Sequence, residues 1–258
     1  MDLNNEEWTP IGEKEGTAFC GEFNGNGKTI SGLNIDKTQV VNDTSEFAGY
    51  YALFGHISTG TNIYDLTVSG SVNAPNAAGV VAYMDGGQLL TVNNEVAVQG
   101  TKVGNGKAGG VVCLANGTYC TITDCKNNGE ISEVENGRGS VGGIVAYVNG
   151  PVTIESCYNH AIINAPNGTN VGGIIGYTDP ASQPVTVIGC FNRNLVTGGK
   201  YVGGIVGAAS SPESTYYYCD NSGKITAREY AGGIAGAFAN ATATECTNAG
   251  DMVEPTEA

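Results

Sequence analysis

Short runs in which apolar and polar residues alternate recur along the whole chain, separated by Gly, Asn and Pro. One stretch holds three such runs in succession: GGIIGYT (172–178), PVTVIGC (184–190) and NLVTGGKY (194–201). Alternation with a period of two predicts β-strands, and none of these runs has the period of an amphipathic helix. The pattern therefore predicts an all-β chain of short strands joined by tight turns.

The runs belong to a repeat with a period near 30 residues, which two independent alignments support. Glycine pairs align on their second residue at intervals of 31, 33, 30, 31 and 29 residues, and cysteines align at intervals of 32, 33, 29 and 27 residues. Leu66 and Val92 fill the cysteine column in the two earlier copies. The glycine column is Gly79, Gly110, Gly143, Gly173, Gly204 and Gly233, and the cysteine column is Cys125, Cys157, Cys190, Cys219 and Cys246.

A unit of three short strands cannot bury a core of its own. Stacked units can, because each strand pairs with its equivalent in the next unit at about 4.8 Å. A propeller blade is longer and has four strands, and leucine-rich repeats need Leu and Asn at offsets that are absent here. The sequence therefore predicts a right-handed parallel β-helix (β-solenoid) of about eight coils of roughly 30 residues.

Stacking explains why particular residues recur, because equal positions in successive coils lie over one another. The cysteine column becomes a buried stack of small side chains, and the asparagines two residues later are predicted to form a ladder of amide hydrogen bonds. Two residues further on, residues such as Gly129 and Gly223 predict a left-handed corner. The glycine pairs predict close approach of neighbouring groups. The ladder column is Asn94, Asn127, Asn159, Asn192, Asn221 and Asn248.

Two of the repeats resemble a known family. The stretches VGGIVAYVNGPVTIESCYNHAII and VGGIIGYTDPASQPVTVIGCFNRNLVTGG are similar to the GLUG-type repeat of bacterial surface and adhesin-like proteins. Upstream, EEWTPIG and FCGEFNGNGKTISGLNI resemble the segment that precedes such repeats, and the latter is similar to the opening coil of pectin-lyase-like β-helices. The resemblance implies an N-terminal coil and cap over residues 1–47, repeats over 48–253, a tail over 254–258, and an extracellular or cell-surface location.

Composition agrees with a single ordered domain over residues 1–258. Glycine accounts for 40 of the 258 residues, hydrophobic residues for 41% and charged residues for 14%, which favours a continuous core without long helices. The net charge of −14 repels nucleic acid and anionic membranes. No apolar stretch is long enough to span a bilayer, and the opening MDLNNEEWTP lacks an export signal, which is compatible with secretion if such a signal has been trimmed.

Five of the eight cysteines, those of the cysteine column, are predicted to be buried thiols, because stacked side chains with parallel Cα–Cβ bonds do not meet the geometry of a disulfide. Cys113 occupies a column of small residues and is predicted to be buried, while a pairing of Cys120 and the redox state of Cys20 stay open. Thiols in a line do not form a tetrahedral zinc site, and no CxxC pair occurs. We therefore expect no metal and no cofactor.

Catalysis is not expected, although one alternative is enzymatic. His56 and His160 are the only histidines, and we interpret both as structural or solvent-exposed because no nucleophile motif accompanies them. The alternative is a polysaccharide lyase or glycoside hydrolase, which needs paired carboxylates. Asp65 and Asp124 share the column before the cysteines and lie two coils apart, nominally about 9.6 Å.

A binding surface is the favoured function, because several of the 13 tyrosines fall on adjacent coils. Tyr158 and Phe191 each follow a cysteine, Tyr201 and Tyr230 each precede a glycine pair, and Tyr217 belongs to STYYYC. Exposed aromatic faces stack on sugars or anchor protein partners. We expect a non-enzymatic, adhesin-like scaffold that contacts a host or bacterial surface protein or glycan, with a carbohydrate-binding module as the first alternative.

The C-terminal end of the solenoid raises a separate expectation. The chain stops soon after its last CTNAG, and an uncovered coil presents unpaired strand edges. We expect the last coil to be irregular, capped by the tail, or covered by a partner or by further domains of a longer chain.

Overall fold

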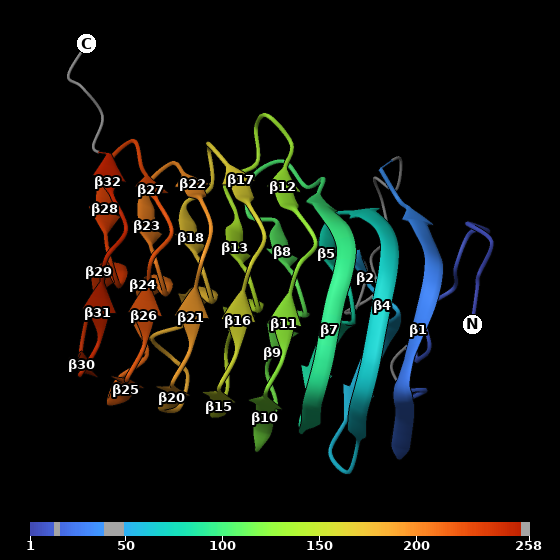
Figure 1. The fold of residues 1–258 in the computed structure, drawn as a ribbon. Coiled ribbons are helices and arrows are strands. Elements are labelled where there is room, and N and C mark those ends of the chain that lie inside the picture. Colours follow the sequence, from blue (N-terminus) through green and yellow to red (C-terminus); the bar gives the residue numbers. More distant parts are fainter. Residues whose placement is uncertain (13–15, 39–48, 254–258) are drawn as a thin grey trace.

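The computed structural model describes residues 1–12, 16–38 and 49–253, which form a three-sided β-solenoid (Figure 1). Strands pair in parallel with their equivalents in the next coil, and the described ranges contain no helix. The predicted all-β parallel solenoid is therefore confirmed. Its right-handed sense stays a prediction.

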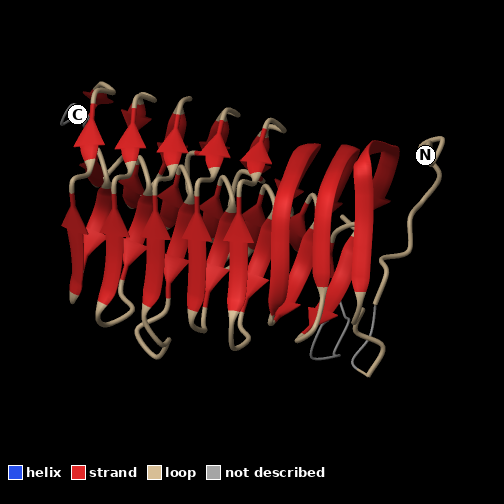
Figure 2. Cartoon of the chain, turned by 60° about the horizontal axis from the view of Figure 1, so that its bottom comes forward, coloured by secondary structure: helices blue, strands red, loops and turns tan. Residues whose placement is uncertain are grey.

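The first face is an 18-stranded sheet in which long strands give way to rows of three short strands (Figures 1 and 2). The long strands are β1 (Glu22–Asp36), β4 (Asn62–Ala74) and β7 (Gly87–Gly100). The short strands are β10 (Cys120–Thr123), β11 (Lys126–Asn127), β12 (Ile131–Glu133), β15 (Val152–Glu155), β16 (Tyr158–Asn159), β17 (Ile163–Ala165), β20 (Val185–Ile188), β21 (Phe191–Asn192), β22 (Val196–Gly198), β25 (Ser214–Tyr217), β26 (Asp220–Asn221), β27 (Ile225–Thr226), β30 (Ala241–Thr244), β31 (Thr247–Asn248) and β32 (Met252–Val253).

Over the described residues, the second and third faces each contain seven strands. The second face consists of β2 (Tyr50–Tyr51), β5 (Asn76–Ala78), β8 (Lys107–Gly109), β13 (Ser140–Gly142), β18 (Asn170–Gly172), β23 (Tyr201–Gly203) and β28 (Tyr230–Gly232). The third face consists of β3 (Phe54–Ser58), β6 (Val81–Asp85), β9 (Val112–Ala115), β14 (Val145–Val148), β19 (Ile175–Thr178), β24 (Val206–Ala209) and β29 (Ala235–Phe238). The inward side chains of all three faces form one continuous hydrophobic core.

The solenoid makes about six complete turns, because seven stacked strands on a face are joined by six turns of the chain. The expected eight coils were slightly too many. The difference lies at the N-terminal end, where residues before β1 form isolated bridges, Ile11 with Phe54 and Phe19 with Ile57, in place of paired strands.

The glycine pairs recur because the asparagine ladder occupies the space beside them. Each side-chain amide donates to the side-chain oxygen of the next asparagine, with N–O distances of 2.7 to 2.8 Å from Asn94 to Asn248, and the predicted ladder is confirmed. A Cβ on Gly143 would lie 2.0 Å from the carbonyl oxygen of Gly173 and 2.7 Å from Cγ of Asn159. The second glycine of the pair is therefore required by close approach.

The left-handed corner lies one residue before the cysteine column, and the predicted corner at the Gly129 column is wrong. Gly129 is absent from the residues with positive φ, and its glycine is required because a Cβ would lie 2.0 Å from the carbonyl oxygen of Val96. Glycine is needed at this position because the backbone of the preceding coil lies close, and not because the backbone is left-handed. The corner residues, with φ between 51° and 57°, are Asp65, Thr91, Asp124, Ser156, Gly189, Tyr218 and Glu245.

The column cysteines lie one over another inside the solenoid. The backbone N–H of Tyr158 donates to the carbonyl oxygen of Cys125 in the coil before, and the same bond links each later pair of coils. All eight cysteines are free thiols, so Cys120 is unpaired, and Cys20 is exposed. Burial raises the pKa of Cys157, and it raises the pKa of Cys113 to about 12. These buried thiols therefore stay protonated and unreactive at neutral pH.

The two ends of the solenoid differ. The N-terminal residues lie along the outer edge of β1, with Asp2 bridged to Ser31 and Glu7 bridged to Asn34. The last coil is regular over its described residues, because β30, β31 and β32 all pair in register with the coil before. The proposed irregularity is therefore not seen there. The boundary at residue 47 and the tail over 254–258 lie outside the described residues.

Candidate functional site

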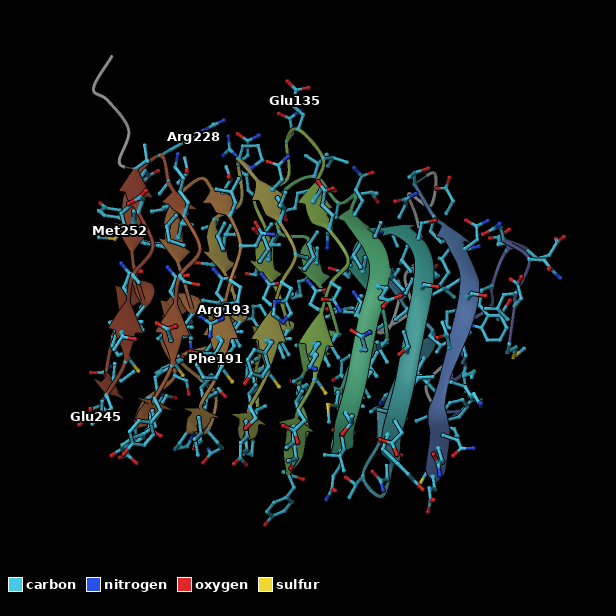
Figure 3. The ribbon with its side chains drawn as sticks, in the orientation of Figure 1. Glu135, Phe191, Arg193, Arg228, Glu245 and Met252 are labelled. Atoms are coloured by element: carbon cyan, nitrogen blue, oxygen red, sulfur yellow. The ribbon has the colours of Figure 1, made fainter. Side chains whose placement is uncertain are left out.

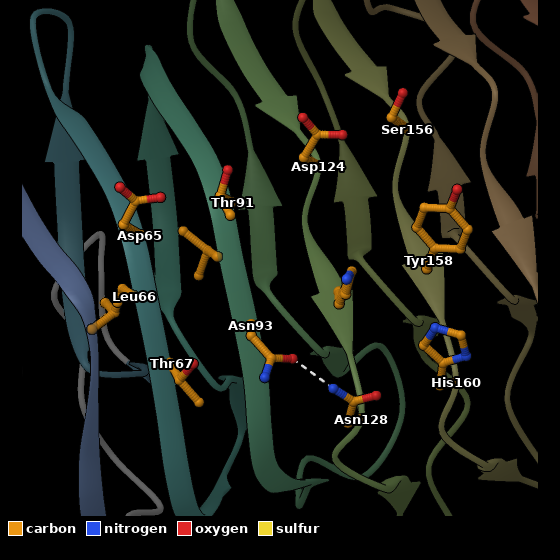
Figure 4. Close-up of a pocket in the computed structure, with 13 residues that line it drawn as sticks. Asp65, Leu66, Thr67, Thr91, Asn93, Asp124, Asn128, Ser156, Tyr158 and His160 are labelled. Carbon is orange, nitrogen blue, oxygen red and sulfur yellow. Dashed lines mark hydrogen bonds between the residues drawn. The ribbon is translucent and has the colours of Figure 1, made fainter.

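An open groove of about 700 Å³ crosses the first face where its coils turn at the left-handed corner (Figure 4). Its floor includes Leu66 and Val92, whose side chains are almost fully buried. Its other lining residues are Gly27, Asp65, Thr67, Thr91, Asn93, Asp124, Lys126, Asn128, Ser156, Tyr158 and His160. The groove therefore has an apolar floor and a largely polar lining.

The left-handed corner places a row of polar side chains along the groove. Asp65, Thr91, Asp124 and Ser156 follow one another in successive coils, parallel to the solenoid axis (Figure 4). A left-handed conformation costs a non-glycine residue roughly 1–2 kcal/mol, and it is most unusual for a β-branched residue such as Thr91. The chain thus holds four side chains here in a conformation that glycine would adopt without this cost.

Aromatic rings stand at one end of the groove. The rings of Tyr158 and His160 are parallel to within 7°, with their centroids 5.9 Å apart. Both rings are seen roughly face-on in Figure 4. Tyr158 also stacks on Phe191 in the next coil at 4.9 Å and 16°. The Arg193 guanidinium lies 5.0 Å from the Phe191 ring and pairs with Asp220 at 3.1 Å. This stack holds the Tyr158 ring in place.

The groove offers hydrogen-bonding groups of every kind. The Asn128 side-chain amide donates to the side-chain oxygen of Asn93 at 2.5 Å (Figure 4), and Lys126 is exposed beside them. Carboxylates accept, amides and hydroxyls both donate and accept, and the ammonium group donates. Such a set suits a ligand rich in hydroxyl groups. The two predicted carboxylates, Asp65 and Asp124, both line this groove.

The structure divides the five aromatic residues predicted for binding among three places. Tyr158 lines the groove, and Phe191 stacks on it from the next coil without lining the groove itself. Tyr201 and Tyr230 stack on each other at 5.2 Å and 14° on the second face. Tyr217 belongs to β25 on the first face, outside the groove, with its ring 5.9 Å from that of Tyr218. They therefore do not form one site.

Sequence reasoning missed several groove residues. His160 is exposed at the groove, whereas His56 is 7% exposed and packs edge-on against Tyr83 at 4.9 Å. Asn93 and Asn128 were also missed. Their exposure could have been predicted from the sequence, because each lies one residue from a ladder asparagine. Side chains alternate along a strand, so the neighbours of a buried residue point outward.

The described part of the chain contains no group of three or more His, Cys, Asp or Glu side chains placed to hold a metal ion. No helix long and apolar enough to cross a membrane occurs among these residues.

Comparison with known proteins gives a partial likeness. Halomucin from Haloquadratum walsbyi is 35% identical over 108 residues, which cover 42% of this chain and 1% of halomucin. No protein-family model matches the sequence, and no solved structure matches it significantly. The resemblance to GLUG repeats therefore stays a prediction, while the solenoid itself rests on the structure.

Proposed function

We propose that this chain is a non-enzymatic module of a surface protein that holds a glycan in the groove of the first face. The solenoid is the scaffold, and the groove is the contact surface. The partial likeness to halomucin is compatible with a surface setting. An adhesin-like role and an extracellular location belong to the same proposal.

The observation that carries the proposal is the ring of Tyr158 at the end of a polar groove. A sugar ring has an apolar face of C–H groups and a rim of hydroxyls, so it needs a flat aromatic surface beside hydrogen-bonding groups. Tyr158 and His160 supply the surface, and Asp124, Asn128 and Ser156 supply the hydrogen bonds.

The test is glycan binding by Tyr158→Ala beside a matched control. Glycans that bind the wild-type protein on an array are titrated against both variants. Tyr158→Ala is expected to lower affinity about fivefold or more, because stacking on a sugar contributes on the order of 1 kcal/mol or more. Tyr217→Ala removes a tyrosine that is 39% exposed outside the groove, and it should retain wild-type affinity. The proposal fails if no glycan binds, or if both variants lose affinity equally.

A second candidate function has one observation in its favour, which is that Asp65 and Asp124 line the same groove. Two coils separate them by about 9.6 Å, near the outer limit of roughly 6.5–9.5 Å for an inverting glycoside hydrolase. The test is release of reducing sugar from polysaccharides by the wild-type protein. Turnover that disappears in Asp124→Asn, with binding retained, would replace the non-enzymatic proposal.

A further inference from the structure

Basic side chains gather along the edge where the first face turns into the second. Arg138 lies between β12 and β13, Lys200 between β22 and β23, and Arg228 between β27 and β28, while Lys107 begins β8. Figure 3 shows Arg228 at this edge. We call these four residues the basic edge. They are four of the 11 Lys and Arg residues in a chain of net charge −14.

Two adjacent hollows connect the basic edge. One, of about 360 Å³, is lined by Lys107 and Arg138 together with Tyr147 and Tyr177. The other, of about 330 Å³, is lined by Arg138, Lys200 and Arg228. Both are lined by Arg138 and Thr169, so they adjoin. Together they form a path along the solenoid axis.

Among the described residues, no cation of the basic edge forms an ion pair with a carboxylate, although Glu229 lines the same hollow as Lys200 and interacts with its charge at longer range. The ion pairs among the described residues are Lys37 with Glu7 and Arg193 with Asp220, and neither includes a member of the edge. Arg228 donates to the side-chain oxygen of Asn167 at 2.7 Å. Such a contact orients the guanidinium and leaves its charge unneutralised. The acids nearby are Glu133, Glu135 and Glu229, of which Glu133 is largely buried and the other two are exposed.

An exposed aromatic stack adjoins the same cations. Tyr201 and Tyr230 overlap on the second face, and Tyr230 is 53% exposed. The Lys200 ammonium lies 4.9 Å from the centroid of the Tyr201 ring, and Arg228 lies two residues before Tyr230. Flat rings beside unpaired cations suit a ligand that combines a sugar face with an acidic group.

We propose that the basic edge binds an extended acidic polysaccharide whose sugars carry carboxylate or sulfate groups. Its four cations span four coil intervals, about 19 Å at a strand spacing of about 4.8 Å, so they match a chain laid along the axis. A polysaccharide is favoured over nucleic acid. Duplex DNA carries one negative charge per roughly 1.7 Å, so the remaining acidic surface of this protein repels it more strongly than a polysaccharide with more widely spaced charges. The site is separate from the groove, and the proposal does not rest on the proposed function.

The experiment compares two double variants with the same change in net charge. Arg138→Gln with Arg228→Gln removes two members of the basic edge, whereas Lys28→Gln with Lys224→Gln removes two exposed lysines elsewhere. Polygalacturonate, dextran sulfate, neutral dextran and duplex DNA are titrated against each protein at 50 and 300 mM NaCl. Circular dichroism checks that both variants keep the wild-type fold.

The wild-type protein should bind polygalacturonate or dextran sulfate, and its affinity for them should be lower at 300 mM NaCl than at 50 mM. It should not bind neutral dextran. The edge variant should lose at least about tenfold in affinity, and the control variant less than about twofold. Tyr158→Ala should bind as the wild type does, which separates this site from the groove. Equal losses in the two double variants, no binding at 50 mM NaCl, or tighter binding of DNA than of either polysaccharide would each overturn the proposal.

Discussion

At the residue scale, glycine serves two distinct purposes in this chain. Gly143 stands where any Cβ would meet the next coil, although its backbone is not left-handed. Gly189 has a φ of 57°, a Cβ added to it would meet nothing within 4 Å, and equivalent coils place Asp, Thr, Ser, Tyr or Glu there. The sequence alone shows glycine in both cases. Only the structure tells whether glycine is present because a neighbouring coil lies too close for a Cβ or because the backbone is left-handed.

This distinction predicts unequal costs for two alanine substitutions. Gly143→Ala should lower the free energy of unfolding by at least about 3 kcal/mol, because the new Cβ overlaps a carbonyl and a ladder asparagine. Gly189→Ala should cost only about 1 kcal/mol, the penalty of a left-handed alanine. Urea unfolding followed by circular dichroism measures both values. Equal costs would show that the ladder does not fill the space beside Gly143.

Glu133 gives the molecule a specific pH dependence. Burial raises its pKa from 4.5 to about 7, and the backbone N–H of Gly139 only partly offsets this. Between these values the folded state keeps a proton that the unfolded state has released, so stability falls as pH rises. One pKa unit corresponds to about 1.36 kcal/mol, so the free energy of unfolding should fall by about 3 kcal/mol from pH 4.5 to 8.

Glu133→Gln tests this dependence, because glutamine carries no titrating proton. The difference in unfolding free energy between the variant and the wild type should grow in favour of the variant as pH rises through 7. Glu135→Gln, two residues along and exposed, is the control and should follow the wild type. If the difference in unfolding free energy between Glu133→Gln and the wild type did not vary with pH, the raised pKa of Glu133 would be contradicted.

At the scale of the element, the coil is the unit that the chain repeats. Strands of two to four residues, such as β16 and β19, are too short to be stable alone. Their stability comes from pairing with the same strand above and below, as when Asn159 pairs with Asn192. A chain built in this way is stabilised mainly by interfaces between nearest neighbours.

Deletion of one complete coil should therefore be tolerated. Removing residues 144–173 joins Gly143 to Ile174, which replaces Ile144 at an equivalent position. The shortened chain should keep its β-rich circular dichroism and unfold cooperatively within about 10 °C of the parent Tm. Removing 144–158 deletes half a coil and shifts every later side chain out of register, so this control should not fold.

At the scale of the whole molecule, the solenoid and its ladder were predictable from the sequence. Residues that stack on one another in successive coils recur at a nearly constant spacing along the chain. Asn127 and Asn159 recur at equal offsets because they touch. The groove was less predictable, because its shape depends on the left-handed corner, and residues as different as Asp65 and Thr91 share that conformation without a common side chain. The basic edge was missed because Arg138 and Arg228 lie in turns of unequal length, where the repeat is weakest.

The central claim is that like side chains stack along one axis, and a crystal structure of this chain tests it most directly. The account predicts continuous electron density for the six ladder asparagines, from Asn94 to Asn248, in one buried line with amide N–O distances near 2.8 Å. Ladder asparagines found on different faces, or separated by side chains from other columns, would contradict it.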